Sequence, residues 1–278
     1  MSDAEPLVLT DDPAPGIRRL TLNRPAKRNA LSNALRSEIY AGLEASDRDD
    51  SVRVTILRGA GSCFSAGYDL AQNPTKNVPW HTSGGDGFWS RHVVEGHFRV
   101  WDLAKPVIAQ VHGYCLAGGS ELAASCDLVY IAEDAQVGYP PVRSMSPPDM
   151  QFHPWLMGMR NAMELMLTGD AIDGHQAVAM GFANRCFPAE QLEESVLEIA
   201  GRVAKVPVDL QQLNKRSIHR AMEAMGVRSA LRAGTEIQAL GFHQKTALDY
   251  FQKLAGGVTG ALQSRDEDFG DYRTKKKK

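Results

Sequence analysis

The sequence lacks the features that define several large classes of protein. No apolar run is long enough to cross a bilayer, and no basic segment followed by an apolar one stands near the start as a secretory signal would. The 31 Lys and Arg residues nearly balance the 33 Asp and Glu residues, so the net charge of −2 provides no overall attraction to nucleic acid or to a membrane surface. We therefore expect a cytoplasmic protein whose partners include neither nucleic acid nor membrane.

Cysteine is also scarce and shows no pairing pattern. The chain has 4 cysteines, and none belongs to a Cys-x-x-Cys pair or to a Cys/His set with the spacing of a zinc site. Free thiols in a reducing compartment are the simplest interpretation. The sequence therefore predicts no metal site.

What the chain does contain is typical of a globular protein. Hydrophobic residues make up 43% and charged residues 23% of the 278 residues, which argues against disorder. This length is enough for one large domain, or for a domain with an appendage.

The most informative stretch covers residues 105–132. Its apolar, β-branched run at 107–111 predicts a buried strand, and residues 127–132 predict the next one. Between them Gly118-Gly119 opens a short predicted helix with Glu121 in its first turn. A strand that leads through glycines into a helix leaves backbone N–H groups unpaired at the helix start, where they can bind an anion or a developing oxyanion.

Strands and helices alternate along most of the chain. Apolar patterns predict strands at residues 7–9, 17–22 and 52–57, and helices that begin near 31, run over 88–103, and pass through 155–157 and 162–167. The Pro/Gly-rich residues 11–16 predict a turn. Residues 72–87 have the composition of a loop, and both a mobile loop near a site and a plain surface insertion remain open.

The pattern changes near Lys205-Val-Pro207. Residues 209–255 show helical periodicity without a good strand. We therefore divide the chain into a core at 1–205 and a C-terminal helical region at 206–278, and predict an α/β fold class overall. Helices with little core of their own often face a partner, so we predict self-association through this region.

Two glycine-rich turns, Ser65-Ala-Gly-Tyr68 and Ala117-Gly-Gly-Ser120, each follow an apolar strand and precede a helix or helical turn. Backbone N–H groups that converge from two such turns can polarise a carbonyl and stabilise an enolate or a tetrahedral oxyanion. Tight packing of the two backbones is the alternative interpretation, and spacing alone leaves both open.

The chain resembles the crotonase (enoyl-CoA hydratase/isomerase) superfamily over nearly its whole length. The matching segments, in order, are Leu22-Asn-Arg-Pro25, Asn29-Ala-Leu31, Phe64-Ser-Ala-Gly-Tyr-Asp-Leu70, Lys105-Pro-Val-Ile-Ala109, His112-Gly113, Ala117-Gly-Gly-Ser-Glu-Leu-Ala123, Cys126-Asp127, Glu164-Leu-Met-Leu-Thr-Gly169 and, more loosely, Ala177-Val-Ala-Met-Gly-Phe-Ala183. The resemblance implies a crotonase-like ββα spiral core, C-terminal helices that build a homotrimer or a hexamer, and an acyl-CoA thioester substrate. Coenzyme A would then be part of the substrate, with no separate cofactor.

The resemblance also implies roles for individual residues. The backbone N–H groups of Tyr68 and Gly118 would form the oxyanion hole, and Glu121 would be the first of two catalytic acids. The ring of Tyr68 could line the acyl pocket. For Glu121, a purely structural role at the helix start is the alternative. Further substrate-binding positions implied by the match are Lys27, Arg28, Ala66, Gly67, Asp69, Leu70 and Gly119. For Lys27 and Arg28 a solvated loop is the alternative.

At the second catalytic acid the sequence departs from the family. The expected Glu is Pro141 here, and proline cannot transfer a proton. Asp149, just after Pro147-Pro148, is predicted in the first turn of a helix, with His153 on the same face four residues later. Asp149 could supply the missing acid or only cap the helix, and His153 could be catalytic, structural or on the surface.

Three functions remain open at this point. The first is an acyl-CoA enzyme that stabilises a thioester enolate, with enoyl-CoA hydration, a lyase reaction of fatty acid metabolism, as its reaction. The second is hydrolysis or C–C cleavage of a CoA thioester or a cyclic β-diketone by the same site. The third is a catalytically weak acyl-CoA-binding protein.

Overall fold

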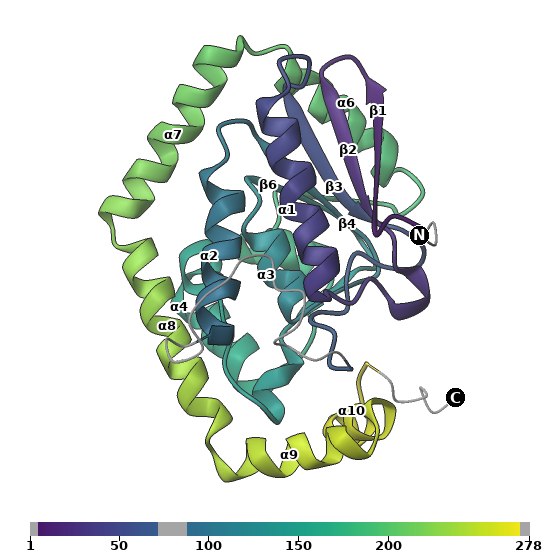
Figure 1. Cartoon of the computed structure of the whole chain (residues 1–278), viewed down its shortest axis with the longest axis vertical. Coiled ribbons are helices and arrows are strands. Elements are labelled where there is room, and N and C mark those ends of the chain that lie inside the picture. Colours follow the sequence, from purple (N-terminus) through teal and green to yellow (C-terminus); the bar gives the residue numbers. More distant parts are fainter. Residues whose placement is uncertain (1–4, 72–87, 273–278) are drawn as a thin grey trace.

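The computed structural model of the chain describes residues 5–71 and 88–272. Its centre is a six-stranded sheet with the order β1-β2-β3-β4-β6-β8 (Figure 1). These strands are β1 (Val8–Ala14), β2 (Ile17–Leu22), β3 (Val54–Gly59), β4 (Val107–Val111), β6 (Leu128–Ala132) and β8 (Arg185–Phe187). β1 and β2 pair antiparallel, and all the other neighbours pair parallel.

A second, smaller sheet lies beside the first. β5 (Tyr114–Leu116) and β7 (Gln136–Gly138) pair parallel, and a parallel bridge from Ser65 to Cys115 adds the loop that follows β3. Each long strand from β3 to β6 is thus followed by a short segment of the second layer. This repeated step confirms the predicted α/β fold class with a crotonase-like spiral core.

Helices cover both layers and form the C-terminal part. They are α1 (Asn33–Arg48), α2 (Phe88–Asp102), α3 (Gly118–Ala124), α4 (His153–Thr168), α5 (Gly174–Met180), α6 (Leu192–Ala204), α7 (Val208–Ala224), α8 (Val227–Phe242), α9 (Lys245–Gly256) and α10 (Val258–Asp266), with the short 3-10 helices η1 (Pro25–Lys27) and η2 (Pro140–Arg143). α1 contacts β1 and β2, and α6 contacts β2, β3, β4, β6 and β8. No helix within the two described ranges is long and apolar enough to cross a membrane.

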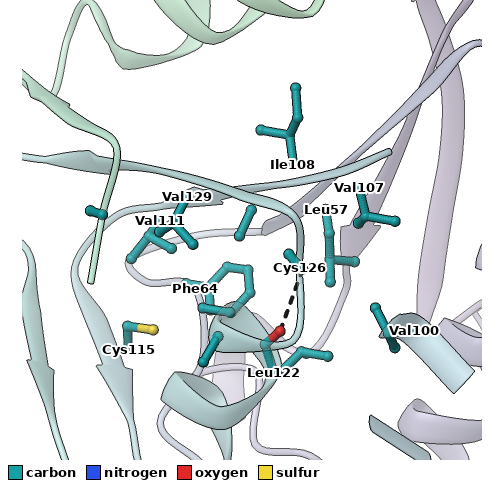
Figure 2. Close-up of a cluster of buried hydrophobic side chains, with 14 of the residues drawn as sticks. Leu57, Phe64, Val100, Val107, Ile108, Val111, Cys115, Leu122, Cys126 and Val129 are labelled. Carbon is teal, nitrogen blue, oxygen red and sulfur yellow. Dashed lines mark hydrogen bonds between the residues drawn. The ribbon is translucent and has the colours of Figure 1, made fainter. Parts of the chain in front are cut away.

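The hydrophobic core lies where the sheet, α2 and α3 meet. Every residue of β4 is buried, as expected for a parallel strand covered on both faces. Figure 2 shows Phe64 from the loop after β3 among side chains of β4, with Leu122 of α3 and Cys126 just after it, close together. The Cys126 thiol donates to the Leu122 carbonyl at 3.4 Å. α3 is therefore anchored in the core, which holds its first turn in a defined place.

α7 to α10 follow one another around one side and one end of the molecule (Figure 1). The change to helices at Val208 lies where the periodicity placed it. α7 is attached to the core through Asp127, whose carboxylate accepts from Lys215 at 2.8 Å and lies 3.2 Å from His219. The division into a core at 1–205 and a helical region at 206–278 stays a prediction.

One local prediction was wrong: β1 continues to Ala14, so the turn is shorter than the predicted 11–16. Ser32 caps α1 by accepting from Leu35 N at 3.1 Å. The two helices predicted through 155–157 and 162–167 are present as the two parts of α4, which is interrupted by the non-helical Gly158, with φ 74° and ψ 164°. Residues 72–87, for which a loop was predicted, lie outside the described residues.

Candidate active site

The two glycine turns predicted from the sequence lie directly against each other. Leu116 N donates to Ser65 O at 3.0 Å, which joins the end of β5 to the first turn. Gly67 has φ +98°, and a Cβ built on it would lie 2.8 Å from the Cβ of Ala117 and 3.4 Å from Gly118 N. Only glycine combines this backbone conformation with so close an approach. The backbone around Tyr68 therefore lies next to the amide of Gly118.

Asn29 holds the first turn in place. Its side-chain NH2 group donates to Ala60 O at 2.9 Å and to Cys63 O at 2.8 Å. Its backbone carbonyl accepts from the Ser65 hydroxyl at 2.9 Å. Asn29 itself has φ 51°, a left-handed conformation that Asn tolerates better than most residues. These contacts explain why Asn29 belongs to the motif that precedes α1.

Gly118 begins α3, and this sets the direction of its N–H group. Ala117 before it has φ 50° and ψ −125°, so the chain turns sharply into the helix. The first N–H groups of a helix have no acceptor within that helix and carry its positive dipole end. A Cβ on Gly118 would lie 2.6 Å from two ring carbons of Tyr68. The Tyr68 ring thus packs on the start of α3.

The carboxyl group of Glu121 is fully buried at the start of α3. Its Oε2 accepts from the Tyr68 hydroxyl at 2.7 Å, and its Oε1 accepts from Met150 N at 3.1 Å. Burial raises the pKa of Glu121 to about 7, although hydrogen bonds from Tyr68, from Met150 N, from the Tyr139 hydroxyl and from the Asp149 amide oppose the rise. A carboxyl group with a pKa near neutral pH can both accept and donate a proton.

Two tyrosine hydroxyls face this carboxyl group. Burial, with the charges of Glu121 and Asp149, raises the pKa of Tyr68 well above its usual range, and the same causes raise the pKa of Tyr139. Both phenols therefore stay protonated at neutral pH and can donate hydrogen bonds.

The Tyr68 hydroxyl has a second neighbour from α2. His97 Nε2 lies 3.2 Å from it, and His97 Nδ1 lies 3.4 Å from the Ser125 hydroxyl. Burial lowers the pKa of His97 to about 3, with a further contribution from the charge of Arg36, so the imidazole is neutral. The Arg36 guanidinium lies 5.8 Å from the centre of the Tyr68 ring.

The predicted position of Asp149 in a helix was wrong. Asp149 and Met150 form a bend, and α4 begins only at His153. The reason is that Glu121 holds this segment through the Met150 amide, whereas Pro154 suits the first turn of the helix that follows. The helical face that Asp149 and His153 were expected to share does not exist, but Asp149 is buried beside Glu121, as a second acid would have to be.

His153 is buried, which excludes the surface position among the alternatives for it. Its Nδ1 lies 2.8 Å from Gln151 Oε1, and its ring stacks with Phe182 at 6.3 Å between ring centres. Burial lowers the pKa of His153 to about 4. Within the described residues, its Nε2 is buried without a hydrogen-bond partner. A catalytic or a structural role remains a prediction.

Pro141 lies in η2, and its carbonyl accepts from the amides of Ser144, Met145 and Ser146. It therefore ends a tight turn and offers no ionisable group. Any second acid at this site has to come from another segment, and Asp149 is the buried carboxylate next along the chain.

The predicted substrate-binding positions lie around the first turn. Lys27 at the end of η1 and Arg28 just after it are exposed, and Arg28 O accepts from Ala66 N at 3.0 Å, which places both cations at the rim of this turn. Asp69 is ion-paired with Arg24 at 2.9 Å. Gly119 packs on the backbone, since a Cβ there would lie 2.7 Å from Ser65 O. Gly67 is buried, and Leu70 is half-buried.

Sequence reasoning missed His97 and Arg36. Both are buried on helices whose inward side chains are mostly apolar, such as Phe98 on α2 and Leu35 on α1. A histidine or arginine on an apolar helix face was the available signal, but nothing in the local sequence connected either residue with Glu121.

Among the residues that the structure describes, one group of side chains outside the site has metal-binding atoms near one another. Glu133, His175 and Cys186 have such atoms within 4.8 Å of each other. However, Cys186 Sγ lies 3.4 Å from Nδ1 of His175, whereas the Glu133 carboxylate is 3.9 Å from Nε2, the opposite ring nitrogen. None of the three side chains is fully buried, and groups of this kind are common without an ion, so we assign no metal here.

Comparison with known proteins identifies the family. The profile of the enoyl-CoA hydratase/isomerase family matches residues 13–270. EchA13 of Mycobacterium tuberculosis, provisionally named an enoyl-CoA hydratase, is 37% identical over 77% of this chain and 74% of its own length. The 2,3-dehydroadipyl-CoA hydratase of Escherichia coli is 32% identical over 90% of this chain and 93% of its own.

Solved structures agree with this result. The crystal structure of an enoyl-CoA hydratase from Mycobacterium smegmatis superposes with a TM-score of 0.88 at 28% identity, over 97% of each chain. An enoyl-CoA hydratase/isomerase from Xanthobacter autotrophicus Py2 gives a TM-score of 0.84 at 31% identity, over 94% of this chain and 98% of that one. The present chain therefore belongs to the enoyl-CoA hydratase/isomerase family of the crotonase superfamily and is an acyl-CoA enzyme.

Proposed function

We propose that this enzyme hydrates 2-enoyl-CoA thioesters. In this proposal the thioester oxygen accepts hydrogen bonds from the backbone N–H groups of Tyr68 and Gly118, and Glu121 is the acid/base group. The observation that carries the proposal is the buried Glu121 carboxyl, with a pKa of about 7, joined to Tyr68 at the meeting point of the two glycine turns. Two relatives that cover most of the chain have hydratase in their names.

The chemistry follows from the charge that develops during addition of water. The Glu121 carboxylate removes a proton from water as the oxygen adds to the β carbon, and negative charge moves to the thioester oxygen. Two preorganised N–H donors stabilise that enolate, and loss of one such donor typically costs about 3–4 kcal/mol of barrier. A proton added to the α carbon completes the 3-hydroxyacyl-CoA product.

A second carboxylate for this reaction would come from Asp149 in place of the position that Pro141 occupies. Asp149 is buried, and its charge raises the pKa of both tyrosine hydroxyls that face Glu121. We propose that it favours the protonated form of these hydroxyls in the resting enzyme. Lys27 and Arg28, exposed beside Ala66, would bind the phosphates of coenzyme A.

We further infer a homotrimer or hexamer built by the C-terminal helices. Large apolar side chains are exposed on α7, α8 and α4 at Leu210, Leu213, Ile218, Ile237, Leu240, Met159, Met163 and Leu167. Burial of such a surface between copies would remove it from water. The free thiols of the four cysteines suit a reducing compartment, and we infer the cytoplasm.

One observation favours a second candidate, hydrolysis or C–C cleavage of a related substrate. His153, with a buried Nε2 that has no hydrogen-bond partner within the described residues, lies near Tyr139 at 6.4 Å between ring centres. A neutral imidazole there could activate water for attack on a carbonyl carbon.

The test is turnover of crotonyl-CoA, followed as loss of enoyl absorbance together with release of free CoA. Wild type should hydrate without releasing CoA, and Glu121→Gln should lower kcat at least about 100-fold, the lower range for loss of an acid/base group. Glu198→Gln, an exposed position on α6, is the matched control and should leave kcat unchanged. Undiminished turnover by Glu121→Gln would contradict the assignment. Release of CoA would favour hydrolysis, and binding without turnover would indicate a non-catalytic protein.

A further inference from the structure

The Tyr68 side chain connects both halves of the proposed site. Its ring packs on Gly118, where an added Cβ would lie 2.6 Å from two ring carbons, and its hydroxyl is 2.7 Å from Glu121 Oε2. The amide of the same residue lies in the turn that approaches Gly118 N. One residue therefore reaches from the expected position of the thioester oxygen to the acid/base carboxyl group.

The direction of the hydrogen bonds follows from the donors present. An ionised Glu121 carboxylate can only accept, so the Tyr68 hydroxyl donates to it. The Tyr68 oxygen can then accept from Nε2–H of neutral His97, 3.2 Å away. At the other ring nitrogen, the Ser125 hydroxyl already donates to Leu122 O at 2.8 Å. Toward His97 the Ser125 hydroxyl can therefore only accept, from Nδ1–H at 3.4 Å, and this contact competes for the single proton of the neutral imidazole with the shorter contact, 3.2 Å, between Nε2 and Tyr68. The Tyr68 proton points at Glu121.

Glu121 is poorly placed to carry both protons of the reaction alone. Its Oε1 is engaged by Met150 N and its Oε2 by Tyr68, and the Tyr139 hydroxyl and Asp149 amide also interact with the carboxylate. A carboxylate has about four acceptor positions. A water molecule that binds Glu121 has to displace one of these donors, of which two are side-chain hydroxyls and two are backbone amides.

We propose that the Tyr68 phenol is the catalytic acid that delivers the proton to the α carbon, with His97 as its positioning residue. Glu121 takes a proton from water as the C–O bond forms at the β carbon. The Tyr68 O–H bond then breaks as the enolate α carbon forms its C–H bond, and protonated Glu121 returns its proton to the phenolate oxygen. Each group ends the cycle in its starting state, and one water molecule has been added.

The surroundings of Tyr68 suit this role. A phenol is a much stronger acid than the α C–H of a thioester, so transfer to the enolate carbon is downhill. The phenolate next to Glu121 and Asp149 is strongly disfavoured, which drives the immediate return of the proton from Glu121. The positive charge of Arg36, 5.8 Å from the centre of the Tyr68 ring, lowers the pKa of the phenol and so stabilises the phenolate during the transfer. The role also explains why the site works with Pro141 at the position of the second family acid.

The test uses Tyr68→Phe, which keeps the ring and the backbone N–H but removes the hydroxyl. Because the inference rests on the proposed hydration, two reactions are measured: hydration of crotonyl-CoA, and exchange of the α protons of saturated butyryl-CoA with D2O, followed by NMR. Exchange needs transfer at the α carbon but no addition of water. Tyr68→Phe should lower both rates by about 10²–10⁴-fold, as for loss of a general acid. Tyr130→Phe, a buried tyrosine on β6, is the matched control and should retain both.

Two further variants separate proton transfer from positioning. A 3,5-difluorotyrosine at position 68 makes the phenol more acidic with nearly the same shape, and its exchange rate should differ from wild type in a pH-dependent way. His97→Gln keeps a donor near the Tyr68 oxygen and should retain much of the kcat that His97→Leu loses, with KM nearly unchanged in both. The pH dependence of the residual hydration rate of Tyr68→Phe should shift to higher pH. Glu121 loses one of the hydrogen bonds that lower its pKa, while those from Tyr139, Asp149 N and Met150 N stay.

Each outcome decides between the two proposals. If Tyr68→Phe retains α-proton exchange while wild type hydrates, the inference is wrong and the hydratase function stands. If wild type exchanges α protons but does not hydrate, the hydratase function fails and Tyr68→Phe still decides the inference. If wild type does neither, both are wrong. A difluorotyrosine enzyme with an unchanged rate at every pH would reduce Tyr68 to a positioning residue.

Discussion

The buried Glu121 carboxyl predicts an unusual dependence of stability on pH. Its pKa is raised from the ordinary 4.5 to about 7, so the folded protein holds this proton more tightly than the unfolded chain does. Protonation therefore favours folding, and the contribution of Glu121 to stability falls as pH rises from about 4.5, the unfolded pKa, to about 7, the folded pKa. At 1.36 kcal/mol per pH unit, the full loss is about 3 kcal/mol.

Replacement by glutamine removes this dependence. Glu121→Gln keeps the shape and one acceptor oxygen but cannot ionise, so its free energy of unfolding should not show the fall. The other titrating groups are common to both proteins and cancel in the difference. We expect the difference in unfolding free energy, Glu121→Gln minus wild type, to increase by about 2–3 kcal/mol from pH 5 to pH 8.

The assay is urea unfolding of both proteins at fixed protein concentration and several pH values, because self-association makes apparent stability concentration-dependent. Glu198→Gln on the surface of α6 should follow wild type at every pH. A constant difference between Glu121→Gln and wild type over this range would refute the reasoning, because it would mean that the buried carboxyl ionises as easily in the folded protein as in the unfolded chain.

Two further predictions concern the glycine turn and the C-terminal segment. Gly118→Ala places a methyl group against the Tyr68 ring, so kcat/KM for crotonyl-CoA should fall at least about 100-fold, whereas Gly201→Ala in α6, with nothing within 4 Å of its Cβ, should leave it unchanged and slightly raise stability. Equal activity in both alanine variants would contradict the role of Gly118. Arg143, 2% exposed, pairs with Asp266 and Asp271, so Arg143→Leu should cost about 3 kcal/mol in urea unfolding and speed hydrogen exchange at 258–272. Unchanged exchange there would show that these pairs do not hold the segment.

Local patterns in the sequence were enough to locate much of the fold. The buried strand at 107–111, the helix that begins at Gly118, and the change to helices after residue 207 all depend on side-chain period and on glycine, which act over a few residues. The family motifs identified Glu121 and Gly118 for the same reason, since each motif is a continuous stretch.

The sequence by itself thus determined the family, the α/β core and the order of its glycine turns, because these follow from neighbouring residues. Only the tertiary structure decided which side chains of the site are joined by hydrogen bonds. Tyr68 and Glu121 are 53 residues apart, and His97 reaches Tyr68 from a third segment. Asp149 left its predicted helix because Glu121 binds the neighbouring amide of Met150. Hydrogen bonds between distant segments, and the burial that raises the pKa of Glu121, exist only once the chain has folded.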